Sequence, residues 1–337
     1  MSTPSNERLN PPNEHAHFVL PGASKSASGS ARSHDSIVAV YPRGISFIDQ
    51  MGAMEGFLTL IGGLGGMVPA TFIAFSYPQS GINWFVIWMG ILVAICLFIV
   101  RADTLTYRYH PVLFNRAAGT VHCFVSEGLS WWKLWQLKPP AHVQTYRWDC
   151  IRGEVVEFTV LGGGGVPRRE YALVCAVDEQ PGSRKVVARF GVGLTSSWNA
   201  DFMVQRWEHI RRYMRGEGPP LANGDTLFKD TTLTSLWAAL TFGQPLLGPG
   251  SGEYWSGQAL NGWWWLTIPG GLVMLPLLPF TVAAGLLRWL SHLLKREPKW
   301  PAEVLASVGG AALSATEVVT PKQTWTQKRK ALKTKRS

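Results

Sequence analysis

Charged residues are distributed very unevenly along this chain, and that distribution limits what it can fold into. Three segments contain no Asp, Glu, Lys, Arg or His: residues 57–77, 84–100 and 266–287. A helix of about 20 apolar residues is long enough to cross the hydrocarbon core of a bilayer, which is roughly 30 Å thick. Only 16% of the 337 residues are charged, whereas an average soluble domain has roughly 25%. We therefore expect membrane-spanning helices joined to a water-exposed part.

A fourth and shorter apolar segment, residues 233–247, decides the expected topology. As a helix it extends only about 22 Å at 1.5 Å per residue, so an interfacial or re-entrant helix is the alternative. Lys and Arg number four in residues 1–55, seventeen in 101–232 and eleven in 288–337, and the connections 78–83 and 248–262 contain none. Because short loops rich in Lys and Arg remain in the cytoplasm, this distribution favours four spans with both termini inside.

The resulting fold class is a membrane α-helical protein of four spans in two hairpins, with an inserted cytoplasmic α+β domain. The expected localisation is the bacterial inner (cytoplasmic) membrane, multi-pass, with both termini cytoplasmic. The expected segments are a disordered arm 1–34, a β-hairpin 35–55, spans 56–77, 84–100, 231–247 and 263–287, a cytoplasmic domain 101–230, and a basic, partly disordered tail 288–337.

The expected spans contain small residues rather than ionisable ones. Ionisable groups at membrane depth are costly and usually mark ion or proton paths, so their absence argues against a pump or a coupled transporter. Gly62 and Gly66 form a GxxxG pair, which lets helix backbones approach closely. Packing among this chain's own helices is one explanation of the pair, and association with a second copy is the alternative.

Residues 101–230 contain β-prone segments separated by turn residues, which predicts a β-rich domain with its own core. The expected strands are 105–109, 112–115, 120–125, 143–148, 154–161, 171–177 and 185–192. A helix is expected at 198–215, because four apolar residues recur on one face: Met203, Trp207, Ile210 and Met214. The hairpin at 35–55 can pair with this domain, and it would be only marginally stable alone.

Seven strands followed by an amphipathic helix resemble the pleckstrin-homology-like (PH-like) fold, a partly open β-barrel capped by a C-terminal helix. The resemblance rests on the order of the elements and on LFNR at 113–116 and WDCI at 148–151. The whole layout is similar to a family of uncharacterised proteobacterial polytopic membrane proteins that are often encoded beside type VI secretion effectors. That similarity is carried by VAVYPRG at 38–44, FNR at 114–116 and WExIR at 207–211. It implies no catalytic motif.

Two groups of residues are candidates for binding a lipid or a protein partner. Trp131, Trp132 and Trp135 form either a half-buried strand or an aromatic loop that faces a membrane or a partner. The second group is basic and lies near the ends of neighbouring strands: Arg168, Arg169, Arg184 and Lys185. A solvated surface is the simplest explanation of this group, and a basic rim that contacts anionic lipid is the alternative.

Several motifs that suggest catalysis or cofactor binding do not meet the requirements of that chemistry. The glycines at 162–165 are followed by Val166 and Pro167, rather than by the Lys and the helix of a phosphate-binding loop. His122 and Cys123 are neighbours on an expected strand, so their side chains point to opposite faces. The histidines and the four cysteines show no metal-ligand spacing. We therefore expect no enzyme activity, no catalytic residue, no cofactor and no metal site.

The sequence thus predicts a membrane-anchored interaction protein, and the family similarity implies a role beside a type VI secretion effector, as an immunity or effector-associated protein. A lipid-sensing or scaffolding membrane protein with a PH-like domain is the alternative, and a membrane enzyme or transporter fits less well. The expected partners are the lipid bilayer and a protein. Association into a homo-oligomer is a further alternative that the sequence does not decide. The basic tail around Lys328, Arg329 and Lys330 is better explained by anionic lipid than by nucleic acid.

Overall fold

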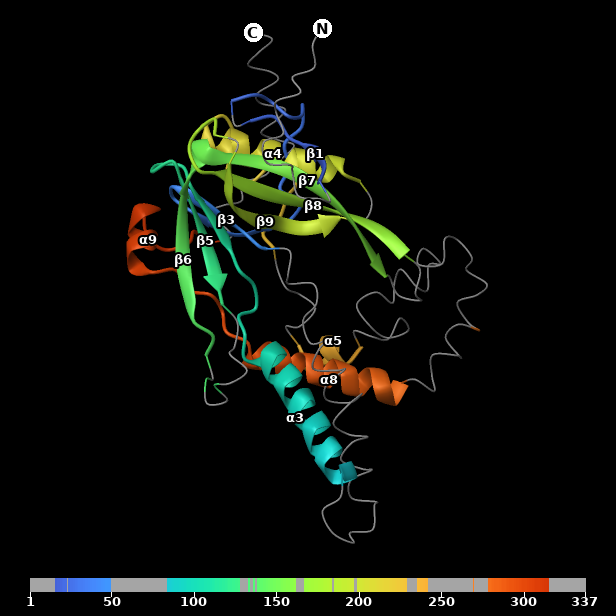
Figure 1. Ribbon diagram of the computed structural model, residues 1–337. Helices are drawn as coiled ribbons and strands as arrows, with labels where there is room; N and C mark the ends of the chain where they lie inside the picture. Colours follow the sequence, from blue (N-terminus) through green and yellow to red (C-terminus); the bar gives the residue numbers. More distant parts are fainter. Residues whose placement is uncertain are drawn as a thin grey trace, which may run out of the picture.

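Two antiparallel sheets, one of five strands and one of four, form the centre of the structure (Figure 1). In the computed structural model the five-stranded sheet has the order β2-β3-β4-β5-β6, and the four-stranded sheet has the order β1-β7-β8-β9. The first contains β2 (Ile37–Tyr41), β3 (Gly44–Phe47), β4 (Val112–Asn115), β5 (Thr120–Ser126) and β6 (Ala141–Arg147). The second contains β1 (Ala16–Val19), β7 (Ile151–Leu161), β8 (Pro167–Asp178) and β9 (Val186–Ser196).

Helices follow or flank the strands. They are α3 (Trp84–Thr104), the 3-10 helix η3 (Trp148–Cys150), α4 (Asp201–Met214), α5 (Leu236–Thr241), α8 (Leu278–Leu294) and α9 (Ala302–Ser307). The structure describes residues 16–22, 24–49, 84–127, 133, 136, 138–161, 167–183, 185–196, 199–228, 235–241, 269 and 278–314.

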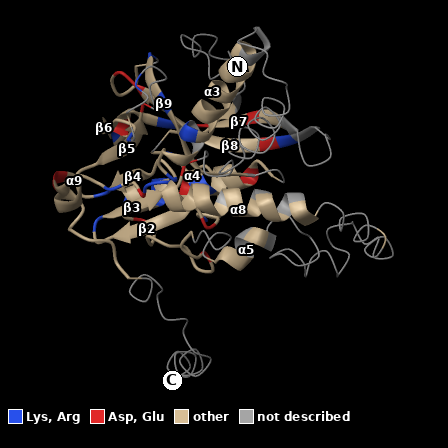
Figure 2. Ribbon diagram, turned by 90° about the horizontal axis from the view of Figure 1, so that it is seen from below, with Lys and Arg blue, Asp and Glu red and all other residues tan. Residues whose placement is uncertain are grey.

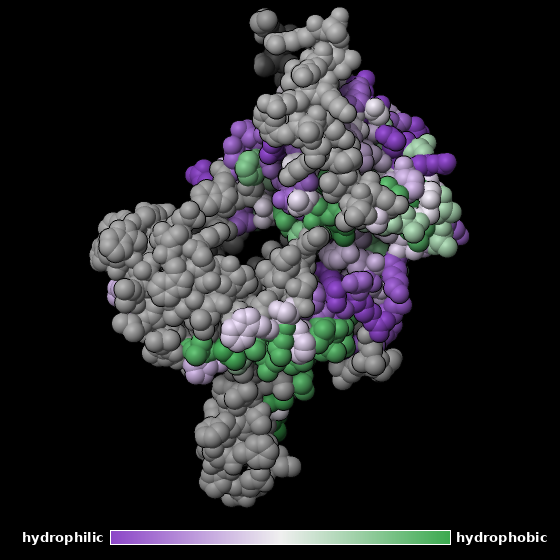
Figure 3. Space-filling model, turned by 180° about the vertical axis from the view of Figure 1, so that it is seen from behind, coloured by the Kyte–Doolittle hydropathy of each residue, from purple (hydrophilic) through white to green (hydrophobic). Residues whose placement is uncertain are grey.

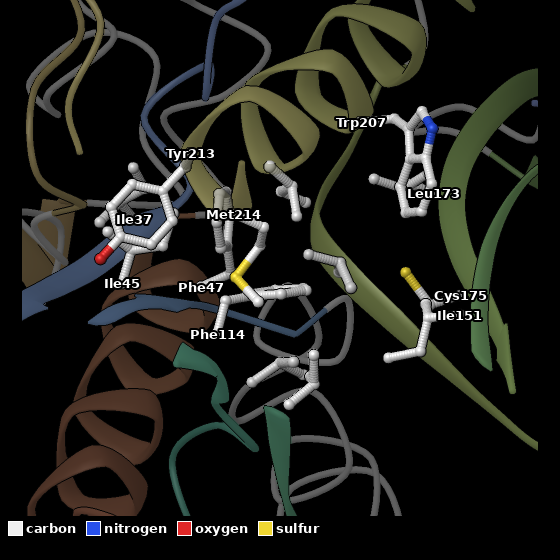
Figure 4. Packing of buried hydrophobic residues seen from close by; sticks show 14 of the residues in the cluster. Ile37, Ile45, Phe47, Phe114, Ile151, Leu173, Cys175, Trp207, Tyr213 and Met214 are labelled. Carbon is white, nitrogen blue, oxygen red and sulfur yellow. The ribbon is translucent and has the colours of Figure 1, made fainter. Parts of the chain in front are cut away.

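Helix α4 packs against both sheets and joins their cores into one cluster. Trp207 lies against the four-stranded sheet, whereas Tyr213 and Met214 lie against the five-stranded sheet (Figure 4). Trp207 can approach β7 closely because residue 153 is a glycine: a Cβ atom there would lie 2.8 Å from Cδ2 of Trp207. The apolar face that the sequence predicted for this helix is therefore the part of the chain that closes the core.

A buried arginine on α4 links this helix to β9 and to the segment before β2. The Arg206 side chain donates hydrogen bonds to the carbonyl oxygens of Ser33, Val192 and Leu194, at 3.3, 3.3 and 2.6 Å. Gly193 has a φ of +76°, and a Cβ atom there would lie 2.7 Å from the guanidinium. Burial lowers the pKa of Arg206 to about 10. A charge enclosed in this way is tolerated because backbone carbonyls accept its hydrogen bonds.

A buried carboxylate on the same helix fixes the N-terminal segment. Glu208 is fully buried and accepts hydrogen bonds from the Ser26 hydroxyl at 3.0 Å and from the Ala27 N–H at 2.9 Å. It also accepts two bonds of 2.9 Å from Arg211 and one of 2.7 Å from Arg212. Burial raises the pKa of Glu208, but the hydrogen bonds from Arg211, Ala27, Arg212 and Ser26 outweigh it and lower the pKa to about 2.

The opposite face of the five-stranded sheet is covered by α9. Val308, together with Trp300 and Leu305, packs on Tyr41 and Leu113. The backbone N–H of Arg43 donates to the carbonyl of Val308 at 3.0 Å, so the hairpin turn is attached to the end of α9. The five-stranded sheet is thus enclosed between α4 and α9.

The helices α3, α5 and α8 form a separate group in which α8 contacts the other two. Figure 2 shows that Lys, Arg, Asp and Glu gather around α4 and the strands, whereas these three helices are mainly uncharged. Several of their large apolar side chains are exposed, including Trp88 at 64% and Trp237 at 66%. This group contains the described parts of three of the apolar segments from which membrane spans were predicted.

The membrane fold predicted from the sequence is contradicted by the structure. Among the described residues, no helix combines the length and the apolarity needed to cross a membrane. This finding overturns the four-span fold class, the multi-pass inner-membrane localisation and the two expected hairpins of spans. The described residues are instead built mainly on two antiparallel sheets.

The prediction relied on the absence of charge, and apolar composition alone does not distinguish a membrane span from a helix that packs within a protein. Within 231–247 the described residues include α5, and within 263–287 they include residue 269 and the first part of α8. From Leu278, α8 continues through Arg288 and His292. The second segment does form a helix, α3, which extends beyond it through Arg101. The first expected span, 56–77, lies outside the described residues.

The expected PH-like barrel is also replaced by two separate sheets, although a helix follows the last strand as predicted. The N-terminal strands take part in both sheets. The expected hairpin pairs with the domain through β3 and β4, as predicted, whereas the pairing of β1 with β7 was not predicted. Residues 16–22 and 24–34 are therefore not part of a disordered arm as expected, and the rest of the expected arm lies outside the described residues. The strand expected at 105–109 is reduced to one isolated bridge, between Tyr107 and Arg296.

The Glu208 network generates a prediction about stability. Replacing Glu208 by Gln leaves Arg211 and Arg212 without their buried carboxylate, so we expect the free energy of unfolding to fall by about 3 kcal/mol. The matched control is Glu217→Gln, because Glu217 also contacts Arg211 but is 44% exposed; we expect its effect to stay within about 1 kcal/mol. Urea unfolding followed by circular dichroism measures both, and equal effects would contradict the assignment.

The same network predicts a pH dependence. The pKa of Glu208 is about 2 in the folded chain, below its ordinary value of 4.5. The unfolded chain therefore binds a proton more readily, and the stabilisation is complete above pH 4.5 and is lost as the pH falls from there toward 2. We expect the wild-type chain to lose stability over this interval more steeply than Glu208→Gln. Parallel curves of unfolding free energy against pH would contradict this.

Candidate functional site

A pocket of about 600 Å³ lies where the segment between α8 and α9 passes the start of β6. Its apolar lining comes from Tyr107, Phe124 and Val143, and its charged lining comes from Lys138, Arg296, Glu297 and Lys299. The pocket therefore combines an aromatic floor with a predominantly positive rim. Residues that are more than 150 positions apart in the sequence, such as Lys138 and Arg296, meet in it.

Backbone hydrogen bonds hold the segment after α8 in place beside the pocket. The N–H of Arg296 donates to the carbonyl of Thr106 at 3.1 Å, and the N–H of Arg108 donates to the carbonyl of Arg296 at 3.0 Å. These two bonds form the bridge between Tyr107 and Arg296. The rim residues of this segment are consequently fixed relative to β5 and β6.

The floor of the pocket is an aromatic cluster centred on Phe124. Its ring contacts the Tyr107 ring edge-to-face at a centroid distance of 4.9 Å and the Trp300 ring at 6.2 Å. The His110 ring stacks on it at 6.4 Å. Aromatic side chains bury a large apolar area in a defined geometry, so this floor can hold the apolar part of a ligand.

The rim carries three exposed cations and one carboxylate. Within the described part of the chain, the side chains of Lys138, Arg296 and Lys299 have no hydrogen-bond or ion-pair partner. Glu297 differs, because its Oε1 atom lies 2.8 Å from Nη1 of Arg108. Burial and the neighbouring Glu297 carboxylate raise the pKa of Tyr109 to about 12. A ligand with negative charge would find unpaired cations on this rim, whereas Glu297 is already engaged.

A second charged group, on the four-stranded sheet, was not anticipated from the sequence. Glu154 is fully buried, with its carboxylate 3.6 Å from Nε of Arg152 and 3.4 Å from Nε of Arg189. Arg152 also lies 3.6 Å from Asp178, where burial raises the carboxyl pKa and Arg152 opposes it. The available signal was the placement of Arg152 and Glu154 two residues apart on a strand, which puts them on one face. The two carboxylates and the two arginines balance in charge around a fully buried Glu154, so we assign the group a structural role.

The residues around His122 and Cys123 are placed on two faces of β5. Cys123 is buried in the core that α4 closes, and burial raises the pKa of its thiol. His122 lies on the other face, 2.9 Å from the Thr145 hydroxyl, and burial lowers its pKa. In the described part of the chain no three His, Cys, Asp or Glu side chains are grouped as metal ligands would be.

Of the binding residues that the sequence singled out, the structure describes the side chains of Arg169 and Lys185, and these two lie apart. Arg169 lies near the start of β8 and contacts Glu157 at 3.1 Å, whereas Lys185 lies beyond its other end and contacts Glu179 at 3.2 Å. Because β8 is an extended strand, these two residues are at opposite ends of the sheet and do not form one basic rim. Outside the described residues, or without a described side chain, are Arg168, Arg184, Trp131, Trp132, Trp135, Gly62 and Gly66.

Comparison with protein families assigns the chain to a group. A family model described as a family of unknown function (DUF6708) matches residues 89–308. The chain belongs to the DUF6708 family. The matched range contains every residue that lines the pocket but not β1, β2 or β3, which complete the two sheets of this DUF6708 protein. Searches of curated proteins and of solved structures gave no match.

The structural role of the Glu154 group gives a testable prediction for this DUF6708 protein. Glu154→Gln leaves two arginines without their buried carboxylate, so we expect the unfolding free energy to fall by about 3 kcal/mol. Glu179→Gln is the matched control, because that carboxylate is 49% exposed and pairs with Lys185; its effect should be within about 1 kcal/mol. Thermal unfolding monitored by calorimetry distinguishes them. An unchanged midpoint for Glu154→Gln would refute the structural role.

Proposed function

We propose that this protein is an interaction protein whose pocket recognises an acidic segment of a protein partner. The observation that carries the proposal is the group of three exposed cations, Lys138, Arg296 and Lys299, around an aromatic recess. Cations from two distant parts of the chain are held together there. Complementary charge of this kind increases association rates and selects among partners.

Both parts of the pocket contribute to the expected selectivity. The cations favour carboxylate side chains, and the floor formed by Tyr107 and Phe124 favours an apolar residue between them.

The expected absence of enzymatic activity and the association with a type VI secretion effector stay predictions. In that reading the acidic segment belongs to the effector, and binding of this chain serves immunity or effector handling. Co-purification of the chain with the product of a neighbouring effector gene tests the association.

Charge reversal at the rim tests the proposed function. The probe is the end-capped peptide Thr-Glu-Val-Glu-Val-Glu-Thr, and the variant is Lys138→Glu with Lys299→Glu. We expect the Kd to rise about tenfold or more, because each reversal removes an attraction and adds a repulsion. The interaction should also weaken as the ionic strength increases from about 0.05 to 0.5 M.

The control reverses two exposed cations that lie away from the pocket, Arg169→Glu with Lys185→Glu, and should leave the Kd within about threefold. Fluorescence anisotropy with the labelled peptide measures each Kd. The proposal fails if both double variants weaken binding equally, or if the wild-type chain does not bind the peptide at about 1 mM.

A further inference from the structure

The four edges of the two sheets are not protected in the same way. The edges are β2 and β6 in the five-stranded sheet, and β1 and β9 in the four-stranded sheet. An edge strand presents unpaired N–H and C=O groups to which another strand can bind, and proteins normally cover, shorten or distort such edges. An edge without such protection therefore indicates a surface that can accept a further strand.

Three of these edges are covered, short or irregular. On β2, the carbonyls of Ile37 and Val40 accept hydrogen bonds of 2.7 Å from the N–H groups of Phe228 and Leu313. The strand β1 has only four residues and a shift of register against β7. The strand β9 has two register shifts against β8 and donates the Gly193 N–H to the carbonyl of Ile48 at 2.7 Å.

The remaining edge, β6, has none of these features. Its seven residues pair with β5 in an unbroken register from Thr120–Arg147 to Ser126–Ala141. It contains no proline, and Ala141, His142 and Thr145 are exposed. No backbone hydrogen bond from residues 141–147 to a described residue outside β5 is present along its outer side.

The open edge lies at the pocket. Ala141, His142 and Val143 of β6 belong to the pocket lining, beside Lys138 and opposite Lys299. The surface seen from behind carries a hydrophilic patch next to the hydrophobic band of the helices (Figure 3). Alternate side chains of a strand point to the same face. A strand added along β6 would therefore present every second side chain to the cations of the rim.

We propose that the acidic partner segment binds as an added antiparallel or parallel strand on the outer edge of β6. The expected ligand is an extended segment with acidic residues at alternate positions. Its carboxylates contact Lys138, Arg296 and Lys299. Main-chain hydrogen bonds to β6 supply affinity, and the charged rim supplies selectivity. This inference rests on the proposed function and adds the binding mode to it.

Backbone methylation of the probe peptide tests the binding mode with the intact chain. N-methylation removes an N–H donor and leaves the side chains and the net charge unchanged. In an added strand, N–H groups alternate between pointing at β6 and pointing away. Two versions of Thr-Glu-Val-Glu-Val-Glu-Thr are compared, one methylated at the three Glu nitrogens and the other at the two Val nitrogens and the last Thr nitrogen.

We expect one version to bind about tenfold or more weakly than the parent peptide and the other to stay within about threefold. Amide hydrogen exchange should slow across residues 141–147 when the parent peptide is bound. If both versions bind like the parent while Lys138→Glu with Lys299→Glu still weakens binding, strand addition is wrong and the proposed function stands. Equal weakening of both versions also overturns strand addition.

The edge has one competing occupant, a second copy of this chain. Sedimentation velocity without peptide, combined with hydrogen exchange of residues 141–147, identifies it. A monomer with rapidly exchanging β6 amides supports the proposal. A dimer whose β6 amides are already protected overturns it, because the edge would then be occupied before the partner arrives.

Discussion

The structure depends on the way α4 is enclosed. One face of this helix buries Trp207 and Ile210 between the two sheets, and its charged residues are buried as well. Arg206 and Glu208 cannot be exposed to water there, so each is satisfied by hydrogen bonds within the protein. Arg206 donates to the carbonyls of Leu194 on β9 and of Ser33. Glu208 accepts from Ser26 and Ala27, and also from Arg211 and Arg212 of the same helix. Enclosing the helix therefore fixes the N-terminal segment and the four-stranded sheet together.

The position of the pocket follows from the packing on the face of the five-stranded sheet that lies opposite α4. There α9 and Trp300 pack on Leu113 and Phe124, so the segment between α8 and α9 must cross the end of β5 and β6. The bridge between Tyr107 and Arg296 fixes the crossing point. Lys138, Lys299 and Arg296 are thus brought together at the β6 edge of the five-stranded sheet.

Local patterns predicted the elements that depend on local sequence. The strand at 112–115 has the predicted bounds, and the helix predicted at 198–215 is observed at Asp201–Met214. The strand β1 was missed, because Ala16–Val19 lies among polar residues and is stabilised by pairing with Glu154–Val156, far away in sequence. The pocket was missed for the same reason, since the basic residues after α8 were assigned to a tail rather than to a site. Apolar runs without charge were assigned to a bilayer because composition alone does not distinguish a membrane span from a helix that packs within a protein.

In the proposed complex, the rim and the outer edge of β6 form one recognition surface for an acidic segment. Photo-cross-linking can locate this surface: the probe peptide carries a benzophenone at its central residue, and mass spectrometry identifies the attachment sites on the full-length chain. We expect adducts within residues 138–147 and 296–301, and their loss when unlabelled peptide is added in excess. Competable adducts concentrated elsewhere, for example near Arg169 at the start of β8, would contradict it.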